Sequence, residues 1–486
     1  MTPQLARRLL GASAVLGVLA NWLLTVDSWR AGFVLWVLVV LGVALAAERA
    51  RAMDPTVHRE RRLLYGSAAT LAMLLVLRDA PLLYAFDFLA FLVVMFLVAW
   101  RARGRSLTQL EPRDACIGVA ASVTALVAGA PTLALRDASA TEIPADTRRS
   151  STGFGIGTLA AAPVLLVVAL LLVEADPLFA GLVERTGVFL EGEIIGHLLF
   201  VGAATWVTAG ALRGSLIPVG LSRTSLRGEL RLSFATVTPL LGGLSFLLSA
   251  WIGLQVRTLF GGAEYVADTA GVTVASYARQ GFFELIVIAG IVLAALLVVD
   301  DVLDRTAESA RGKFRILGQV LVGLVGAVLL SAVIRLSLYL RFYGLTEDRV
   351  MALLVLTWVA LVLAWFAMSV LRGVRARFAP GVLVLSAMWL GVINVANPER
   401  WIVETNVRRA ERGLDFDVAY HAKLSGDAVP TMLATADRLG PPRAAALRAA
   451  LTTEWEGRAM MRADWRRWSL PYAQSVRRMA PSAAPQ

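Results

Sequence analysis

Residues 254–285 read LQVRTLFGGAEYVADTAGVTVASYARQGFFEL and connect two long apolar runs. The stretch leaves the first run at Arg257, crosses a polar segment, and enters the second run together with Glu284. A carboxylate just inside an apolar run costs free energy to bury in a membrane, and such residues are typical of functional sites. We therefore expect 254–285 to form a loop at a membrane surface, with Glu284 at its edge.

The composition extends this interpretation to the whole chain. Of the 486 residues, 57% are hydrophobic and only 17% are charged. Many apolar runs reach the roughly 20 residues that a helix needs to cross a bilayer, whereas the alternation over about ten residues that marks a membrane β-barrel is absent. The sequence thus predicts an all-α fold, a polytopic transmembrane helical bundle followed by a helical extramembrane tail.

The distribution of arginine predicts how the bundle is oriented. Cytoplasmic loops of membrane proteins are enriched in basic residues. The loops 213–231, 300–315 and 372–377 carry four, four and three arginine or lysine residues, whereas the acidic loop 174–193 carries one, so we expect a cytoplasmic N-terminus and an extracytoplasmic tail. The net charge of +11 indicates topology and contact with anionic lipid, so the lipid bilayer is the expected partner and nucleic acid is not. The expected spans are 9–26, 31–47, 63–77, 82–100, 155–173, 194–212, 234–254, 282–299, 316–339, 350–371 and 380–395.

One apolar segment, 116–135, leaves the number of spans open. It is rich in small residues, contains Pro131, and is flanked on both sides by segments that contain several arginines. A re-entrant or interfacial segment gives eleven spans, whereas a crossing segment gives twelve and moves the basic loop 48–62 outside. We favour eleven. The expected regions are a four-span region (1–114), the weak segment with its polar loop (115–154), a seven-span core (155–396) and the C-terminal helical tail (397–486).

Near the end of the tail, Trp465, Trp468 and Tyr472 stand among arginines. Such a pattern is typical of an aromatic and basic belt that faces lipid headgroups. The same residues could instead form the core of a small helical domain. Spacing alone does not distinguish the two.

Several charged and aromatic residues gather at the span ends expected on the extracytoplasmic side. Arg335, Tyr339 and Tyr343 lie on one stripe of a helix, and a charge inside a span must pair or face water. We expect Glu284 to pair with Arg335, either in an outward-facing polar pocket or in a structural ion-pair network that ties helix ends together. The full candidate set is Arg257, Glu264, Arg279, Glu284, Arg335, Tyr339, Tyr343, Glu347 and Arg349.

Residues with catalytic or metal-binding chemistry are sparse. Cys116 is the only cysteine, and the three histidines are far apart in sequence without metal-ligand spacing. Phosphate-loop, zinc-protease and nucleophile-elbow motifs are absent. We expect no catalytic residue, no cofactor and no metal. Asp87, about two turns into a span, is either a proton or cation site or a hydrogen-bond partner for a neighbouring helix.

Six groups of short motifs form a recognisable set. They are Arg78-Asp79-x-Pro81; Ala175-Asp176-Pro177-Leu178-Phe179; Leu259-Phe260-Gly261-Gly262 with Tyr277-Ala278-Arg279-x-Gly281-Phe282-Phe283-Glu284-Leu285; Arg335-x3-Tyr339-x3-Tyr343-Gly344-Leu345-Thr346-Glu347-x-Arg349; Asn397-Pro398-x7-Asn406; and Asp417-x2-Tyr420 with Leu424-Ser425-x-Asp427-Ala428-x-Pro430. Together they resemble a bacterial multi-pass membrane family catalogued only as a domain of unknown function, the "forty-one fifty-three / forty-one seventy-three" group. The resemblance implies a bacterial cytoplasmic (inner) membrane protein and implies no activity.

Three hypotheses for function follow. The favoured one is a non-catalytic envelope sensor or scaffold that acts through its outer loop and its tail, with an envelope protein as partner. The alternative is a transporter or permease with a polar pocket near Glu284 and Arg335. The third is a lipid- or glycan-modifying enzyme, for which only Glu264, Glu284 and Glu347 are suitable carboxylates.

Overall fold

The computed structural model describes residues 2–25, 30–49, 55–102, 107, 110, 112–138, 192–217, 232–260, 282–303, 308–461 and 464–479. Within these ranges the fold is all-α, with a single isolated bridge between Leu232 and Leu303 and no strand. Eight of the described helices are long and apolar enough to cross a membrane. The predicted helical membrane bundle is therefore confirmed, and the span predicted at 155–173 lies outside the described residues.

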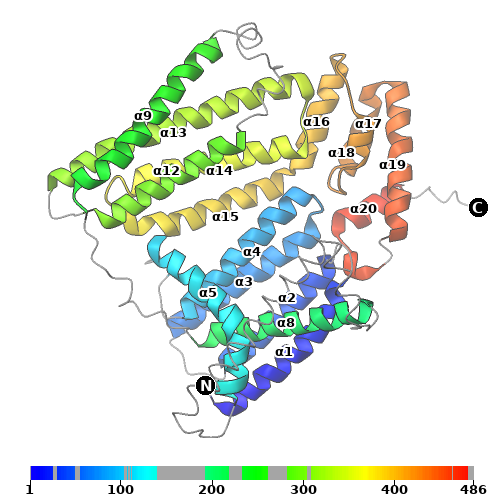
Figure 1. Cartoon of the computed structure of the whole chain (residues 1–486). Coiled ribbons are helices and arrows are strands. Elements are labelled where there is room, and N and C mark those ends of the chain that lie inside the picture. Colours follow the sequence, from blue (N-terminus) through cyan, green and yellow to red (C-terminus); the bar gives the residue numbers. More distant parts are fainter. Residues whose placement is uncertain are drawn as a thin grey trace, which may run out of the picture.

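The long helices form two groups, each with its own hydrophobic core. The first group comprises α1 (Pro3–Leu24), α2 (Arg30–Arg49), α3 (Pro55–Leu77), α4 (Pro81–Ala102), α5 (Pro112–Thr132) and α8 (Gly192–Leu216). The second comprises α9 (Phe234–Phe260), α12 (Phe282–Val302), α13 (Glu308–Tyr343), α14 (Glu347–Ser369) and α15 (Phe378–Ala396). The two groups lie side by side, with α4 next to α15 (Figure 1).

In the first group, small residues allow close helix packing. A Cβ atom on Gly17 of α1 would lie 2.8 Å from the Val201 carbonyl oxygen of α8, and one on Gly129 of α5 would lie 2.7 Å from the Gly210 Cα. Close backbone approach through small residues is how membrane helices pack without a hydrophobic driving force. Helix α8 thereby joins the N-terminal helices although more than fifty residues separate it from α5.

Helix α5 continues directly into the π-helical turn η2 (Leu133–Asp137). The first turns of α5 and the end of η2 both lie near the same end of the first helix group. Gly118, near the start of α5, packs against Trp100 in the last turn of α4. Asp137 forms an ion pair with Arg213 in the last turn of α8, at 2.7 Å. The C-terminal tail binds the turn before α4 and the end of α1, beside which α8 begins, so Trp100 and Arg213 in the last turns of α4 and α8 lie at the end remote from the tail.

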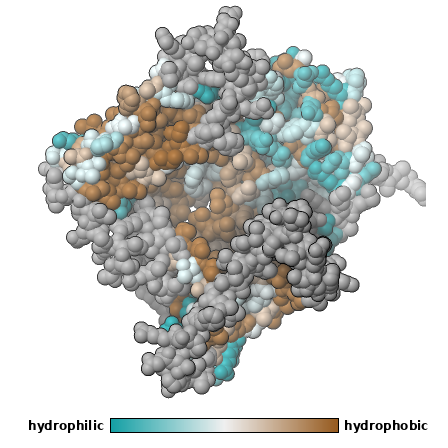
Figure 2. Space-filling view, viewed as in Figure 1, coloured by the Kyte–Doolittle hydropathy of each residue, from teal (hydrophilic) through white to brown (hydrophobic). Residues whose placement is uncertain are grey.

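The tail folds into a compact group of helices on one end of the bundle, which we call the tail-side end. It contains α16 (Pro398–Glu411), α17 (Val418–Ala422), α18 (Val429–Thr435), α19 (Pro441–Met461), the short turn η6 (Trp465–Arg467) and α20 (Leu470–Met479). These helices gather at the right of Figure 1. Hydrophilic residues cover much of their surface, whereas the long helices present apolar surface (Figure 2).

A third hydrophobic core joins the tail to both helix groups. Leu83 of α4, Val350 of α14 and Ile393 of α15 pack in it with tail residues such as Val403 and Trp455, all of them buried. The tail is thus a packed part of the fold. The turns between α3 and α4 and between α13 and α14 lie at this interface, and these two turns position the polar contacts described next.

Candidate functional site

The most extensive buried polar contacts of the described chain lie where the α3–α4 turn meets the tail. We call this the junction cluster and define it as Arg30, Arg78, Asp79, Gly426 and Asp427. Asp79 and Asp427 are only 2% and 6% exposed. Buried carboxylates are costly unless each oxygen is paired and hydrogen-bonded, so the partners of these two decide whether the cluster is stable.

Asp427 belongs to the tail, and its carboxylate binds the α3–α4 turn. It accepts hydrogen bonds from the backbone N–H groups of Asp79 (2.5 Å) and Ala80 (2.9 Å). Its other oxygen forms an ion pair with Arg78 at 3.2 Å. The two N–H groups stand directly before α4, so this carboxylate from a distant segment satisfies donors that precede the helix. Arg78 also donates to the Asn394 carbonyl at the end of α15.

Asp79 binds the tail in return. It forms an ion pair with Arg30 at 2.9 Å and accepts hydrogen bonds from the Gly426 N–H (3.0 Å) and the Ser469 hydroxyl (3.1 Å). Each aspartate therefore accepts a backbone N–H from the segment that carries the other. With one arginine on each carboxylate, both charges are compensated and the oxygens are held by directed bonds.

Gly426 allows the segments to approach this closely. A Cβ atom here would lie 2.8 Å from the Pro471 carbonyl carbon and 2.9 Å from the Tyr472 nitrogen, both backbone atoms that cannot move aside cheaply. The Ser475 hydroxyl donates to the Gly426 carbonyl at 3.2 Å. The position therefore requires glycine for space, although its φ is ordinary.

The tail binds the α13–α14 turn through a separate set of contacts. The Asn406 side chain accepts from the Leu345 N–H and donates to the Leu345 carbonyl, both at 2.8 Å. The Tyr420 hydroxyl accepts from the Glu347 N–H at 2.9 Å. Burial raises the pKa of Tyr420 to about 12 and lowers the pKa of His421, which lies 3.0 Å from the Asn406 amide nitrogen. Both side chains are thus neutral near pH 7 and act as hydrogen-bonding groups.

Glu399 is the remaining buried carboxylate at this interface. It is 1% exposed, and it accepts from the Ser425 N–H (3.2 Å) and hydroxyl (2.6 Å). No ion pair to it is found among the described residues. Burial raises the pKa of Glu399 to about 8; the Ser425 hydroxyl bond opposes that shift, while the nearby Asp427 and Glu347 charges add to it. This carboxyl group is therefore protonated in the folded protein at neutral pH.

Five of the predicted site residues have described side chains, and three of them meet: Tyr339, Tyr343 and Arg349. We call these three the tyrosine–arginine cluster; the fourth, Glu347, instead donates its backbone N–H to Tyr420 of the tail. The Arg349 guanidinium carbon lies 4.3 Å from the Tyr339 ring centre and 6.0 Å from the Tyr343 ring centre. Arg349 also donates to the carbonyls of Tyr343 and Gly344. This arrangement caps the end of α13, where a cation complements unsatisfied carbonyls.

The fifth described residue, Arg335, is buried in α13 with its guanidinium carbon 5.6 Å from the Trp251 ring centre. Its predicted partner Glu284 lies outside the described side chains. The same holds for the side chain of Arg257 and for all of Glu264 and Arg279. The proposed Glu284–Arg335 ion pair therefore stays a prediction.

The structure also describes the contacts of Asp87 and of the aromatic residues near the C-terminus. Asp87 is buried and accepts a hydrogen bond from the Asn394 amide at 2.9 Å, which links α4 to α15. Of the three aromatic residues considered near the C-terminus, Tyr472 is buried against Trp455, whereas Trp465 and Trp468 are exposed. Tyr472 therefore belongs to the core of the tail and the two tryptophans lie on its surface, while the lipid-facing belt stays a prediction. Among the described residues, no group of three or more His, Cys, Asp and Glu side chains has the geometry of a metal site.

The junction cluster was not among the predicted site residues. Three of its members, Arg78, Asp79 and Asp427, do occur in the motifs Arg78-Asp79-x-Pro81 and Ser425-x-Asp427 on which the family resemblance depends. The available signal was the charged pair Arg78 and Asp79 in a four-residue turn between two apolar runs. A turn this short offers a buried carboxylate few hydrogen-bond partners of its own. The partner of that turn, however, lies 348 residues away, and spacing does not indicate such a pairing.

The fold and these contacts define a multi-pass integral membrane protein with a docked C-terminal helical domain. The chain matches the family described as a domain of unknown function (DUF4153) over residues 65–434, which is more than half of its length. The chain belongs to this family. Comparison with curated proteins and with solved structures finds no match. The matched segment ends within the tail and includes both turns that the tail binds.

Proposed function

We propose that the protein is a non-catalytic scaffold or sensor of the bacterial inner membrane, in which the C-terminal domain holds two helix groups together and presents a surface to an envelope protein. One observation carries the proposal. The tail binds the α3–α4 turn of one group through Asp427 and the α13–α14 turn of the other through Asn406. A domain that is fixed to both groups can transmit a change in their relative position to whatever binds its exposed face.

The orientation of the bundle is part of this proposal. We infer a cytoplasmic N-terminus, an extracytoplasmic tail and eleven spans, with 116–135 not crossing. The position of both ends of α5–η2 near the end remote from the tail supports this inference. Single-cysteine labelling is the test: in a Cys116→Ser background, Leu414→Cys should react with a membrane-impermeant maleimide added to intact spheroplasts. Protection of that cysteine until lysis would reverse the orientation.

Site-specific photo-crosslinking in living cells tests the scaffold itself. Trp401 and Leu414 are each 41% exposed on the tail, and a photoreactive residue there should capture one discrete protein. Val392 and Val395 on the apolar α15 are the matched controls and should capture lipid only. Introducing Asp427→Ala, which breaks the junction cluster, should weaken capture at the tail. Identical capture patterns at tail and control positions would contradict the proposal.

A permease is the second candidate, because the two groups have separate cores and a buried carboxylate lies between them. Asp87 bonds to Asn394 across α4 and α15, the helices at which the groups meet. The pocket near Glu284 and Arg335 remains part of this candidate. Proteoliposomes with an internal pH indicator and an imposed membrane potential should then show proton entry that Asp87→Asn abolishes. Rates equal to those of protein-free liposomes would exclude proton-coupled transport.

A further inference from the structure

The imidazole ring of His421 lies inside the tail, beside the contact that the tail makes with the α13–α14 turn. The residue is only 2% exposed. Its ring stacks on Phe416, with 4.1 Å between ring centres, and stands edge-on to Tyr420 at 5.2 Å. This packing fixes the plane of the ring, so each ring nitrogen keeps one partner.

These partners determine which ring nitrogen carries the hydrogen. Nδ1 lies 2.6 Å from the Asp417 carbonyl oxygen, which can only accept, so Nδ1 is the donor. Nε2 lies 3.0 Å from the amide nitrogen of Asn406. The orientation of that amide is determined by Leu345, because only one orientation both accepts from the Leu345 N–H and donates to the Leu345 carbonyl. Nε2 therefore accepts a hydrogen bond, and the ring is neutral.

A proton on Nε2 would face a donor. With the Asn406 amide in place, two N–H groups would point at each other in a buried site, which costs free energy. Turning the amide by 180° would offer its oxygen to the ring but would break both bonds to Leu345. The amide has no room to shift toward the turn, since a Cβ atom on Gly344 would lie 2.5 Å from the Asn406 Oδ1. Protonation of His421 thus competes directly with binding of the α13–α14 turn.

The charges around the ring do not favour a second cation. The titratable or charged side chains on the elements packed around it are Asp417, Tyr420 and Lys423 on or beside α17, Glu399 and Arg409 of α16, Glu347 of α14, and Arg458 of α19. Arg409 and Arg458 donate to backbone carbonyls here and remain charged. Burial lowers the pKa of His421, and the carbonyl and charge of Asp417 oppose that shift only in part. The ring is therefore harder to protonate when the tail is packed than when it is released.

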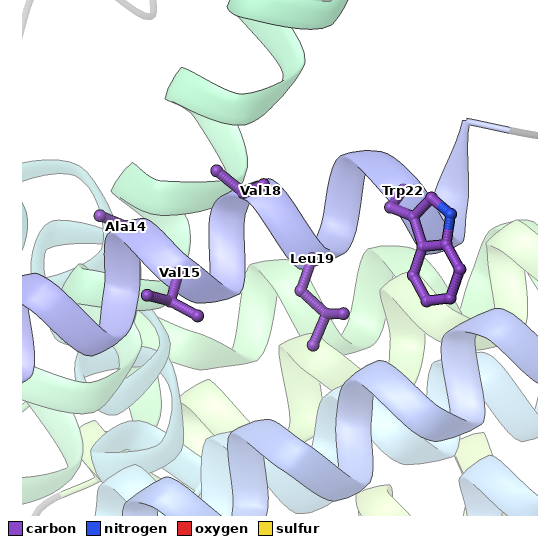
Figure 3. A pocket seen from close by; sticks show the side chains of 5 residues that line it. All are labelled: Ala14, Val15, Val18, Leu19 and Trp22. Carbon is purple, nitrogen blue, oxygen red and sulfur yellow. The ribbon is translucent and has the colours of Figure 1, made fainter.

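The contacts of the tail with the first helix group involve no histidine among the described residues. The junction cluster consists of arginine, aspartate and glycine. A second contact lies at Trp22 near the end of α1 (Figure 3), whose ring centre is 5.8 Å from that of Trp465. Arg466 donates to the Trp22 carbonyl. His421 is the one histidine of the tail sequence, so a proton on it acts on one of the two attachments and spares the other.

We propose that His421 is a pH-sensitive switch that releases the α13–α14 turn from the tail when the solution on the tail side becomes acidic, while the junction cluster keeps the tail on the first group. The bound state holds the ring neutral and the released state lets it take a proton. The contact is therefore complete above about pH 6.5, the ordinary pKa of histidine, and weakens as the pH falls below that value. The stimulus rests on the proposed function, because an extracytoplasmic tail senses acidification of the envelope. The switch itself does not depend on that orientation.

Hydrogen exchange of the purified full chain in detergent measures both attachments at once. The Leu345 N–H reports the contact with the α13–α14 turn, and the Ala80 N–H reports the junction cluster, since each bonds to a tail side chain. The experiment uses Glu399→Gln protein, because Glu399 has the opposite pH dependence. After correction for intrinsic exchange rates, protection at Leu345 should fall by up to about tenfold from pH 6.5 to 5.5, while protection at Ala80 stays unchanged. Constant protection at Leu345 would overturn the switch.

His421→Gln, added to the same background, tests whether this ring takes the proton. Glutamine places an amide oxygen near the position of Nε2, which accepts from Asn406 without titrating, so the loss of protection in acid should disappear. His197→Gln is the matched control: His197 is exposed on α8 and bonds to Asn21, and its replacement should leave the loss intact. Persistence of the loss in His421→Gln, or its disappearance in His197→Gln, would assign the proton to another group.

The Glu399→Gln protein retains His421, so its own pH profile decides the question even if His421→Gln does not fold. These measurements need no partner protein, whereas photo-crosslinking of the tail tests for one. Failure of the switch and failure of the scaffold proposal are therefore distinguishable.

Discussion

The junction cluster and the tyrosine–arginine cluster lie at the same end of the bundle but differ in how they are held. In the junction cluster, buried side chains bind groups that are far away in the sequence, as Asp427 does with Asp79, 348 residues away. In the tyrosine–arginine cluster, Arg349 binds carbonyls five and six residues away and stacks on partly exposed rings. The first arrangement fixes one domain to another, whereas the second completes a helix end. The number of charged residues in a segment does not distinguish these two roles. Burial of the side chains and the sequence separation between contacting residues do distinguish them.

Among substitutions in these two clusters, removal of the Asp427 carboxylate should cause the largest loss of stability. Asp427→Ala leaves Arg78 and two backbone N–H groups without their shared acceptor, and breaking a buried ion pair costs about 3–5 kcal/mol. Thermal unfolding in detergent, with limited proteolysis to detect release of the tail, measures the loss.

Asp437→Ala is the matched control for that substitution. The Asp437 side chain is 82% exposed and pairs with Arg448 on the surface, so its removal should cost at most about 1 kcal/mol. Equal destabilisation by the two alanine substitutions would mean that the junction cluster does not hold the tail.

Glu399 should make tail stability depend on pH. Its pKa is about 8 in the folded protein and near its ordinary value when unfolded, so between these values the folded state binds the extra proton. The contribution to stability is complete at acid pH and decreases as pH rises to about 8, by at most about 1.4 kcal/mol per pH unit. Glu399→Gln should remove this dependence and stabilise the protein relative to wild type at pH 8.5. A wild-type profile that is flat from pH 5 to 8.5 would contradict it.

Gly426→Ala tests the close approach beside the cluster. The added methyl group meets the backbone of Pro471, which should cost about 1–3 kcal/mol of stability. Gly457 in α19 has open space around its Cβ position, and alanine there should stabilise the helix by about 0.5–1 kcal/mol. The two substitutions should thus shift the melting temperature in opposite directions, and a shared direction would argue against close packing at Gly426.

Arg349→Ala should have the smallest effect of the series. It removes two hydrogen bonds to carbonyls and the contact with Tyr339, for a loss of about 1 kcal/mol, and the tail should stay bound to the bundle. Hydrogen exchange at the end of α13 should increase locally. Release of the tail in this variant would show that the tyrosine–arginine cluster also holds the domains together.

The sequence supports the fold class more strongly than the site. Long apolar runs are sufficient to indicate a helical membrane bundle, and the eight apolar helices bear this out. The repeat of Arg335, Tyr339 and Tyr343 correctly indicates a helix, and Tyr343 does lie beside Arg349. Nothing in the spacing indicates that Asp79 faces Asp427, because that pairing depends on how the tail folds back over the bundle.

Asn406 and Tyr420 likewise have binding partners that the sequence does not indicate. Each lies in a motif that supports the family resemblance, yet the target of each is a backbone group of the α13–α14 turn. Backbone donors and acceptors are present at every residue, so the sequence carries no mark of which ones a distant side chain binds. The position of the turn in space determines that choice.

A double-mutant cycle between Asp79→Asn and Asp427→Asn tests most directly whether the two segments are held by one shared cluster. Stability of the tail would be followed by hydrogen exchange over 418–479 in wild type, both single variants and the double variant. Reciprocal bonding predicts a coupling free energy of about 0.5–3 kcal/mol between the two sites. Effects that add to within about 0.3 kcal/mol would contradict it, because they would mean that Asp79 and Asp427 stabilise the protein independently.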